Sequence, residues 1–292
     1  MIIVRIVGGI GNQMFQYALG RVLSLKNITE LKFDLSLQIN RHDVNGSEIE
    51  SIFDIFSINN NIASSDEIKK FTFPFSRSRL LNRINIILKK EHNVIFREGG
   101  FFYPEILNLK GDYFLNGYWQ SYKYFQGYEE IIKKDFEFKK DIIYRKELKE
   151  KILSTEAVSI HVRKGDYLTK ANKKLFYDLQ KEYYEKCVDI ILSKVSNPTF
   201  FVFTNDAEWC EENLSFIENK ILITESKNKN SWEDMKLMTL CKHSIIANST
   251  FSWWGAYLNK NKEKIIIGPE HWFNDSNLYN IHDIIPNEWI LV

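Results

Sequence analysis

Residues 2–20, IIVRIVGGIGNQMFQYALG, join an apolar run, a glycine turn and a segment with helical spacing. The run at 2–7 predicts a buried strand. Apolar residues then recur one turn apart over about 12–26, which predicts a helix. A further apolar run at 31–35 predicts a second strand. This strand–turn–helix–strand beginning is typical of a layered α/β domain.

The rest of the chain divides into an irregular part and a regular part. Residues 36–111 carry prolines, paired glycines and scattered aromatics, which predict loops and short helices. We then expect a strand at 113–119, a helix at 124–136, and a helix or linker at 139–151. Beyond it, strands are predicted at 157–163, 199–204, 220–224, 244–247 and 264–267, alternating with helices at 175–195, 207–214, 232–242 and 251–259. This alternation predicts a parallel sheet with helices on both faces.

Length and composition favour two domains of a globular protein. The chain has 292 residues, of which 44% are hydrophobic and 26% charged. We expect one domain at 1–152 and another at 153–292, with a ligand cleft between them at the carboxyl ends of the strands. The net charge of +1 gives no footprint of a nucleic-acid binder.

Cysteines and apolar runs indicate the compartment. Cys187, Cys210 and Cys241 are odd in number and match no metal spacing, so we expect reduced thiols. The apolar segment 1–7 is too short for a signal peptide or a membrane span. We therefore expect a cytoplasmic protein without a transmembrane segment, with peripheral membrane contact left open.

The glycine turn has two interpretations besides a plain tight turn. Glycines let a backbone approach a ligand, and the helix start offers free amide groups to an anion. Gly9, Gly11 and Asp34 fit part of a dinucleotide-binding fingerprint, but Met14 replaces its third glycine. An NAD-dependent oxidoreductase is thus one alternative.

Asn12 and Gln13 follow the turn at the helix start. Their side-chain amides can donate and accept hydrogen bonds toward a sugar or phosphate. We therefore count Gly11, Asn12 and Gln13 as candidate ligand residues.

The strand at 157–163 ends on a second candidate site. His161 and Arg163 share one face, roughly 6.6 Å apart at about 3.3 Å per residue. Arg163 offers a planar fork for phosphate oxygens at the strand end, where open α/β sheets hold ligands. Asp166 follows in the next loop and could orient that fork or act on a hydroxyl. A structural ion pair between Arg163 and Asp166 is the alternative.

A third candidate site lies near the C-terminus. Asn248 or Ser249 is a good N-cap, so hydroxyls and amides gather at the helix start that follows. Thr250 and Ser252 belong to the same group. Trp253 and Trp254 are interpreted as core residues rather than sugar platforms. Asp234 lies at the start of an earlier helix. Its negative charge either stabilises the N-terminal end of that helix, or its carboxylate contacts a purine or ribose.

Four segments together resemble the α-1,2-fucosyltransferases of bacteria. They are GGIGNQMFQYALG (8–20), HVRKGDY (161–167), VFTND (202–206) and CKHSIIANSTFSWWGAYLN (241–259). The short arginine motif is shared with α-1,6- and protein O-fucosyltransferases, whereas the first and last segments are the specific part. The resemblance extends over most of the chain.

The resemblance implies an α/β fold of GT-B type, with two Rossmann-like domains facing across a cleft. It implies a galactoside α-1,2-fucosyltransferase that uses GDP-β-L-fucose, inverts the anomeric carbon and requires no metal. The N-terminal domain would bind a galactose-containing acceptor, with contacts at about 40–111, and the C-terminal domain would bind GDP-fucose. Family members of this kind act in O-antigen or capsule synthesis, which implies a bacterial cytoplasm.

Residue by residue, the resemblance places Arg163 on the donor diphosphate and His161 close to the nucleotide. It places Asn12 near the reacting sugar or the phosphate. Ser249, Thr250 and Ser252 would form the phosphate-binding helix start. Lys164 stands where a second arginine is commoner, and Asn205 where an acidic residue is often seen.

The acceptor hydroxyl would attack C1 of fucose while GDP leaves. Asp166 is the first candidate for a general base. A second rival function is a non-catalytic carbohydrate-binding protein, which the 14% aromatic content favours.

Overall fold

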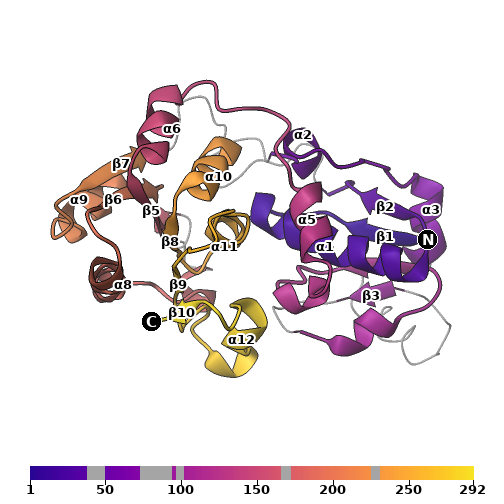
Figure 1. Cartoon of the computed structure of the whole chain (residues 1–292). Helices are drawn as coiled ribbons and strands as arrows, with labels where there is room; N and C mark the ends of the chain where they lie inside the picture. The colour runs from indigo at the N-terminus through magenta and orange to yellow at the C-terminus, as the bar shows by residue number, and fades with distance from the viewer. Residues whose placement is uncertain (38–49, 73–93, 97–101, 166–171, 225–230) are drawn as a thin grey trace.

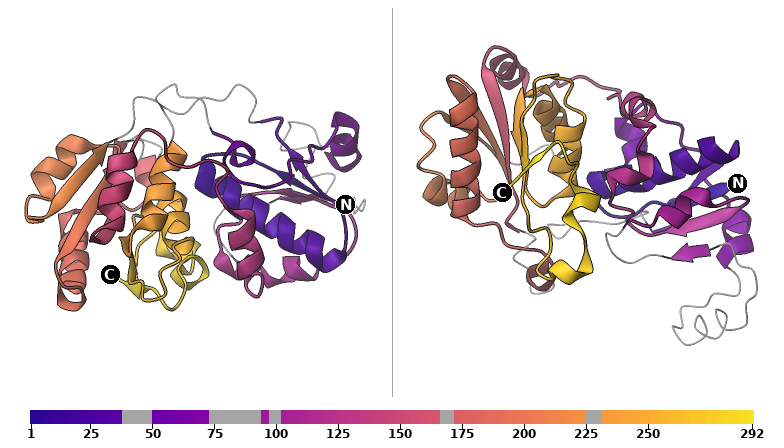
Figure 2. Two further views of the ribbon diagram at one scale, coloured as in Figure 1. Left: turned by 45° about the horizontal axis from the view of Figure 1, so that its top comes forward. Right: turned by 60° about the horizontal axis from the view of Figure 1, so that its bottom comes forward.

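Two sheets, each built of parallel strands, lie side by side and are joined by packed helices (Figures 1 and 2). A computed structural model describes residues 1–292 except 38–49, 73–93, 97–101, 166–171 and 225–230. The first sheet has the order β2-β1-β4-β3 and the second the order β10-β9-β8-β5-β6-β7. Every strand pair among the described residues is parallel.

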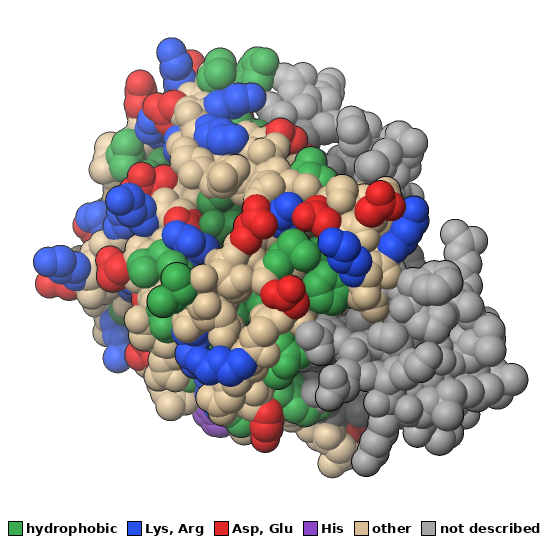
Figure 3. Space-filling view, turned by 90° about the vertical axis from the view of Figure 1, so that its right-hand side faces the viewer, with side chains coloured by type: hydrophobic (Ala, Val, Ile, Leu, Met, Phe, Trp, Pro, Cys, Tyr) green, Lys and Arg blue, Asp and Glu red, His purple; other side chains and the backbone are tan. Residues whose placement is uncertain are grey.

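The N-terminal half contains the first sheet and its covering helices. Its elements are β1 (Ile2–Arg5), α1 (Ile10–Asn27), β2 (Leu31–Asp34), α2 (Ile52–Ile55), α3 (Ser65–Thr72), β3 (Val94–Phe96), η1 (Pro104–Asn108), β4 (Tyr113–Asn116), η2 (Tyr122–Phe125) and α5 (Glu129–Asp135). Figure 3 shows the side of this half that faces away from the other half, where side chains of both charges are interspersed.

The C-terminal half contains the second sheet. Its elements are α6 (Lys146–Leu153), β5 (Glu156–Val162), α7 (Asn172–Leu175), α8 (Lys181–Lys194), β6 (Pro198–Thr204), α9 (Ala207–Asn213), β7 (Lys220–Thr224), α10 (Ser231–Leu240), β8 (His243–Ile245), α11 (Thr250–Tyr257), β9 (Ile266–Gly268), η4 (Ser276–Leu278), α12 (Ile281–Ile284) and β10 (Ile290–Leu291).

Successive side chains of β5 point to opposite faces of the second sheet. Val158 and Ile160 pack with residues of α8, whereas Ala157 packs with residues of α10. Helices therefore cover both faces, as the sequence pattern predicts (Figure 1). The α/β fold class is confirmed, and His161 is placed on the face covered by α10 and α11.

The structure corrects several predicted elements. The strand expected at 113–119 ends at 116, and Trp119 has a left-handed backbone with φ of 54°. The helix expected at 124–136 is divided into η2 and α5 around Gly127, whose φ is 84°. Strands β3 and β10 were not predicted, because two or three residues are too few to show a period.

An aromatic seam of Phe15, Phe125, Trp253 and Trp254 joins the two halves. Phe15 of α1 lies 4.8 and 4.9 Å, between ring centroids, from the two tryptophans of α11. Phe125 stacks on Trp254 at 5.4 Å. The seam belongs to one hydrophobic cluster that reaches into both sheets. Both tryptophans are fully buried, as their interpretation as core residues requires.

The boundary predicted between residues 152 and 153 stays a prediction. Ile142 and Ile152 pack in one cluster with Phe201 and Leu237 of the C-terminal half. The two sheets themselves occupy residues 2–116 and 156–291.

Candidate active site at the facing sheet ends

Each sheet has one place where its strand order reverses. From β5 the chain builds β6 and β7 on one side, and β8, β9 and β10 lie on the other side. In the first sheet the strand order reverses between β1 and β4. Crevices at such switch points, outside the carboxyl ends of the strands, are where open α/β sheets bind ligands.

The switch point of the second sheet holds His161 and Arg163. His161 is 5% exposed, its ring centroid is 5.8 Å from that of Phe251, and its Nδ1 has no hydrogen-bond partner in the described part of the chain. Burial, and then the charge of Arg163, lower the pKa of His161 to about 3. The imidazole is therefore neutral at physiological pH. Arg163 is half-buried just past the end of β5.

Lys164 holds the loop that carries Arg163. Its ammonium lies 2.6 Å from a carboxylate oxygen of Asp178 and 4.3 Å from the ring centroid of Trp209. Its backbone N–H donates to Oδ1 of Asn205 at 3.0 Å. Lys164 and Asn205, the two residues that depart from the commoner family pattern, thus make contacts that hold this loop. Asp166 lies outside the described residues.

The start of α11 supplies the other side of this switch point. Ser249 is the N-cap and makes no capping hydrogen bond with its side chain. First-turn amides lack acceptors within their own helix, and the start of a helix favours an anion. Thr250 Oγ1 donates instead to Oδ1 of Asn12 at 2.9 Å.

Asn248 and Ser252 have structural contacts. Asn248 is 1% exposed and donates through Nδ2 to the carbonyls of Tyr177 and Trp272 at 2.8 and 2.9 Å. Ser252 is 2% exposed and donates to the carbonyls of Ala247 and Ser249. Both side chains thus support the base of the helix start, and their contact with the donor stays a prediction.

The glycine turn of the first sheet meets α11 directly. A Cβ on Gly11 would lie 2.4 Å from the carbonyl carbon of Thr250 and 2.7 Å from the nitrogen of Phe251. The carbonyl of Gly11 accepts a hydrogen bond from Trp254 Nε1 at 3.1 Å. Gly11 therefore permits the close approach of two helices, and its predicted contact with the donor stays a prediction.

Asn12 and Gln13 differ in their surroundings. Asn12 is partly exposed, and its Oδ1 also accepts a hydrogen bond from Gln120 Nε2 at 2.8 Å. Gln13 is fully buried, donates to the carbonyls of Gly8 and Glu50, and accepts from the N–H of Ile52. Gln13 therefore has protein partners for its amide, and its predicted contact with the donor stays a prediction.

Asp234 forms an ion pair with Arg145 of the segment that precedes α6. Arg145 also donates to the carbonyl of Thr224 at 3.0 Å. The carboxylate thus has a protein partner, and its contact with a purine or ribose stays a prediction.

The features that favoured the rival functions have structural explanations. Asp34 is fully buried and accepts a hydrogen bond from Arg5 at 2.9 Å, so the carboxylate expected on an NAD ribose lies within the protein. Every tryptophan except Trp209 is at most 9% exposed, so the aromatic content reflects core packing. The three cysteines are buried and unpaired.

The described ranges contain no group of three or more His, Cys, Asp or Glu side chains that could hold a metal ion. No helix described by the structure is long and apolar enough to cross a membrane.

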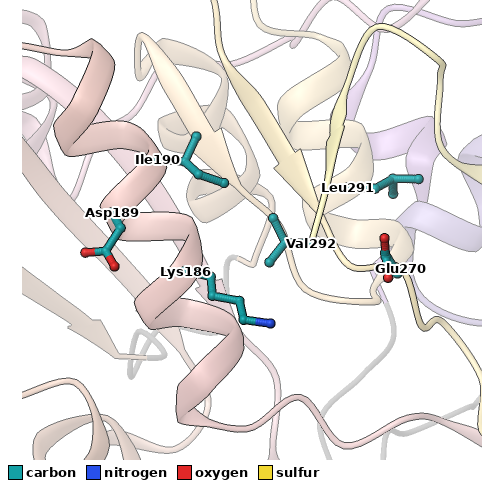
Figure 4. A pocket seen from close by; sticks show the side chains of 6 residues that line it. All are labelled: Lys186, Asp189, Ile190, Glu270, Leu291 and Val292. Carbon is teal, nitrogen blue, oxygen red and sulfur yellow. The ribbon is translucent and has the colours of Figure 1, made fainter.

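A separate surface pocket lies between α8 and the C-terminal strand (Figure 4). Its lining residues are Lys186, Asp189, Ile190, Glu270, Leu291 and Val292. Because α8 covers the face of the second sheet opposite to His161, this pocket is not part of the candidate site.

Gln120 is a further candidate residue of this site that the sequence pattern did not indicate. Gln120 follows β4 at the switch point of the first sheet, where its amide reaches Asn12. Its place directly after a predicted strand was the available signal.

Known sequences match this chain over its full length or over part of it. The sequence model of glycosyl transferase family 11 matches residues 1–292. An α-1,2-colitosyltransferase of Escherichia coli is 31% identical and covers 100% of this chain and 99% of its own length. The O-antigen biosynthesis glycosyltransferase WbnK of E. coli is 31% identical, with 92% and 94% covered. A galactoside α-(1,2)-fucosyltransferase 1 of Leontocebus fuscicollis matches at 31% over 35% of this chain and 28% of its own.

Solved structures share the fold. A mutant of Arabidopsis thaliana FUT1 in complex with GDP superposes with a TM-score of 0.54 at 13% identity, covering 95% of this chain and 72% of the other. The α-1,6-fucosyltransferase NodZ, co-crystallised with GDP, gives 0.50 at 15% identity, with 87% and 90% covered.

Proposed function

The chain belongs to glycosyl transferase family 11, and on that premise we propose that it transfers L-fucose from GDP-β-L-fucose to the 2-hydroxyl of a galactoside. The product would be an α-1,2 linkage formed with inversion, in the synthesis of a bacterial surface glycan such as O-antigen or capsule. The names of the E. coli relatives support this class of reaction and pathway.

One observation carries the proposal. Asn12, after β1 of the first sheet, accepts a hydrogen bond from Thr250, which begins the helix after β8 of the second sheet. Arg163 follows the end of β5, the strand paired with β8. Such an arrangement suits a nucleoside diphosphate sugar in the C-terminal half. The acceptor would then bind in the N-terminal half, with contacts in 40–111, much of which lies outside the described residues.

The chemistry follows from where charge develops. The acceptor oxygen forms a bond to C1 while the bond from C1 to the diphosphate oxygen breaks, and the hydroxyl proton is lost. Negative charge grows on the departing diphosphate, and donors aimed at it contribute the largest catalytic effect in many enzymes. Arg163 and the start of α11 would stabilise that charge without a metal ion. Asp166 remains the proposed base.

Neutral His161 would contact the nucleotide through its unpartnered Nδ1. A buried polar nitrogen without a partner is uncommon in proteins and is often completed by a ligand. Its neutral state allows it to act as donor or acceptor.

The identity of the donor sugar is tested directly. The chain would be incubated with GDP-fucose or GDP-colitose and a panel of galactosides, and the linkage of each product would be read by NMR. Colitose is fucose without its 3-hydroxyl, and a site that hydrogen-bonds this hydroxyl rejects the deoxy sugar strongly. An α-1,2-fucosyl product is expected. Transfer of colitose alone would replace the proposed donor, and absence of GDP-sugar cleavage would remove the enzymatic proposal.

A further inference from the structure

The orientation of the Asn12 carboxamide is fixed by two hydrogen bonds from distant segments. Its Oδ1 accepts from Gln120 Nε2 at 2.8 Å and from Thr250 Oγ1 at 2.9 Å. In this arrangement the amide oxygen faces the two donors, and the nitrogen is the opposite end of the carboxamide. Nδ2 then lies on the side of the glycine turn, 3.0 Å from where a Cβ on Gly8 would stand. None of the hydrogen bonds found among the described residues uses this nitrogen.

The segment that presents Gln120 is held rigidly. Trp119, directly before it, is 1% exposed and adopts a left-handed backbone, which is costly for a bulky residue. Ser121, directly after it, is fully buried and donates to the carbonyl of Asp283 in α12. Lys123 adds an ion pair with the carboxylate of Asp283 at 2.7 Å. Strain kept in place by such surrounding contacts is typical of functional sites.

The three residues come from the two switch points. Gln120 follows β4, Asn12 follows β1, and Thr250 begins the helix after β8. We propose that Gln120 and Thr250 are positioning residues, which hold Asn12 so that its Nδ2, on the side of the glycine turn, donates to an anionic oxygen of the nucleotide sugar. This proposal rests on the proposed function, since the ligand is the same donor.

The direction of the effect follows from the amide itself. If the donors to Oδ1 are removed, the carboxamide can turn and present its oxygen to the diphosphate. An oxygen beside a growing negative charge destabilises the transition state, whereas the N–H groups stabilise it. The effect therefore concerns turnover more than binding of the ground state.

The test uses substitutions without a change of charge. Gln120→Met and Thr250→Val remove the donor groups at similar volume, and Thr250→Ser keeps the hydroxyl. Gln126→Met, at an exposed position at the end of η2, is the matched control for the glutamine substitution. We expect kcat to fall roughly tenfold in Gln120→Met and in Thr250→Val. It should fall about a hundredfold in Asn12→Ala. GDP affinity and Tm should change little, and Thr250→Ser should recover most of the activity lost in Thr250→Val.

Double-mutant cycles between Asn12 and its two partners test whether Gln120 and Thr250 act through Asn12. In the Asn12→Ala background, Gln120→Met and Thr250→Val should each change kcat by less than about twofold, because the group they position is gone. An equal loss in both backgrounds would overturn the positioning role while leaving the fucosyltransferase proposal intact. If the unchanged chain cleaves no GDP-sugar at all, the proposed function fails, and the positioning role fails with it.

Discussion

Replacing Gly11 by alanine should damage both stability and activity. The added Cβ would meet the carbonyl carbon of Thr250 at 2.4 Å and its oxygen at 2.6 Å. Ordinary contact begins near 3.4 Å, so α1 and α11 must separate by about 1 Å. Backbone atoms on a packed helix cannot turn aside, and overpacking of this kind destabilises a protein by about 1–3 kcal/mol.

The same displacement should reduce turnover. It moves Asn12 away from Thr250, and a misplacement of about 1 Å can lower a rate by about a hundredfold. We expect Tm to fall by about 2–4 °C per kcal/mol for a chain of this size class. The assays are calorimetry for Tm and GDP release for kcat of the folded fraction.

Gly9→Ala is the matched control. A Cβ on Gly9 meets nothing within 4 Å, and its φ of −69° suits any residue, so its Tm should stay close to that of the unchanged chain. A Gly11→Ala variant with unchanged Tm and kcat would refute the close-approach explanation. A stable Gly9→Ala variant that loses activity would show instead that the ligand itself approaches this turn.

Four further predictions concern the donor site. Arg163→Lys should lower kcat by about a hundredfold with little change in Tm; a lower Tm with normal turnover would make Arg163 structural. GDP at a hundred times its Kd should stabilise the fold by about 2.7 kcal/mol in thermal shifts, and UDP and NADH should not; equal protection by all three would mean that only phosphate is recognised. EDTA should leave activity nearly unchanged, and recovery by Mn²⁺ after a loss would contradict this. Because the pKa of His161 is lowered to about 3, the unfolded state binds its proton first as pH falls below about 6.5, so stability should decline by up to about 1.4 kcal/mol per pH unit toward pH 3. His161→Phe should flatten that decline in urea titrations, and an unchanged slope would exclude His161 as its cause.

Secondary structure was predictable where the periods were long. The second sheet was anticipated through β9, because each of its strands is followed by a helix or turn with a clear signal. The break at Gly127 was not predictable, since the apolar spacing that begins at Tyr124 continues past the glycine. Whether a glycine in such a run takes a positive φ depends on tertiary contacts.

The sequence indicated the region of the candidate site, but it did not indicate the contacts of individual residues there. Arg163 and Thr250 were expected near the ligand because strand ends and helix starts gather there. The sequence could not show that Gln13 is turned toward backbone carbonyls while its neighbour Asn12 is partly exposed. Amide side chains have the same chemistry in both settings, and only the packing of α1 distinguishes them.

The contact of Arg145 with Asp234 illustrates the same limit. The two residues are 89 positions apart, and no local pattern links them. Long-range ion pairs depend on how the segment before α6 lies over the second sheet.

The aromatic seam also limits how far the two halves can move apart. A hinge that opened the halves like a clamshell would expose Phe15, Trp253 and Trp254 to water, at about 1.5–3 kcal/mol for each large side chain. An open state that costs several kcal/mol is populated in well under one molecule in a hundred. If the proposed function holds, the donor would enter and GDP would leave without a swing of one half away from the other.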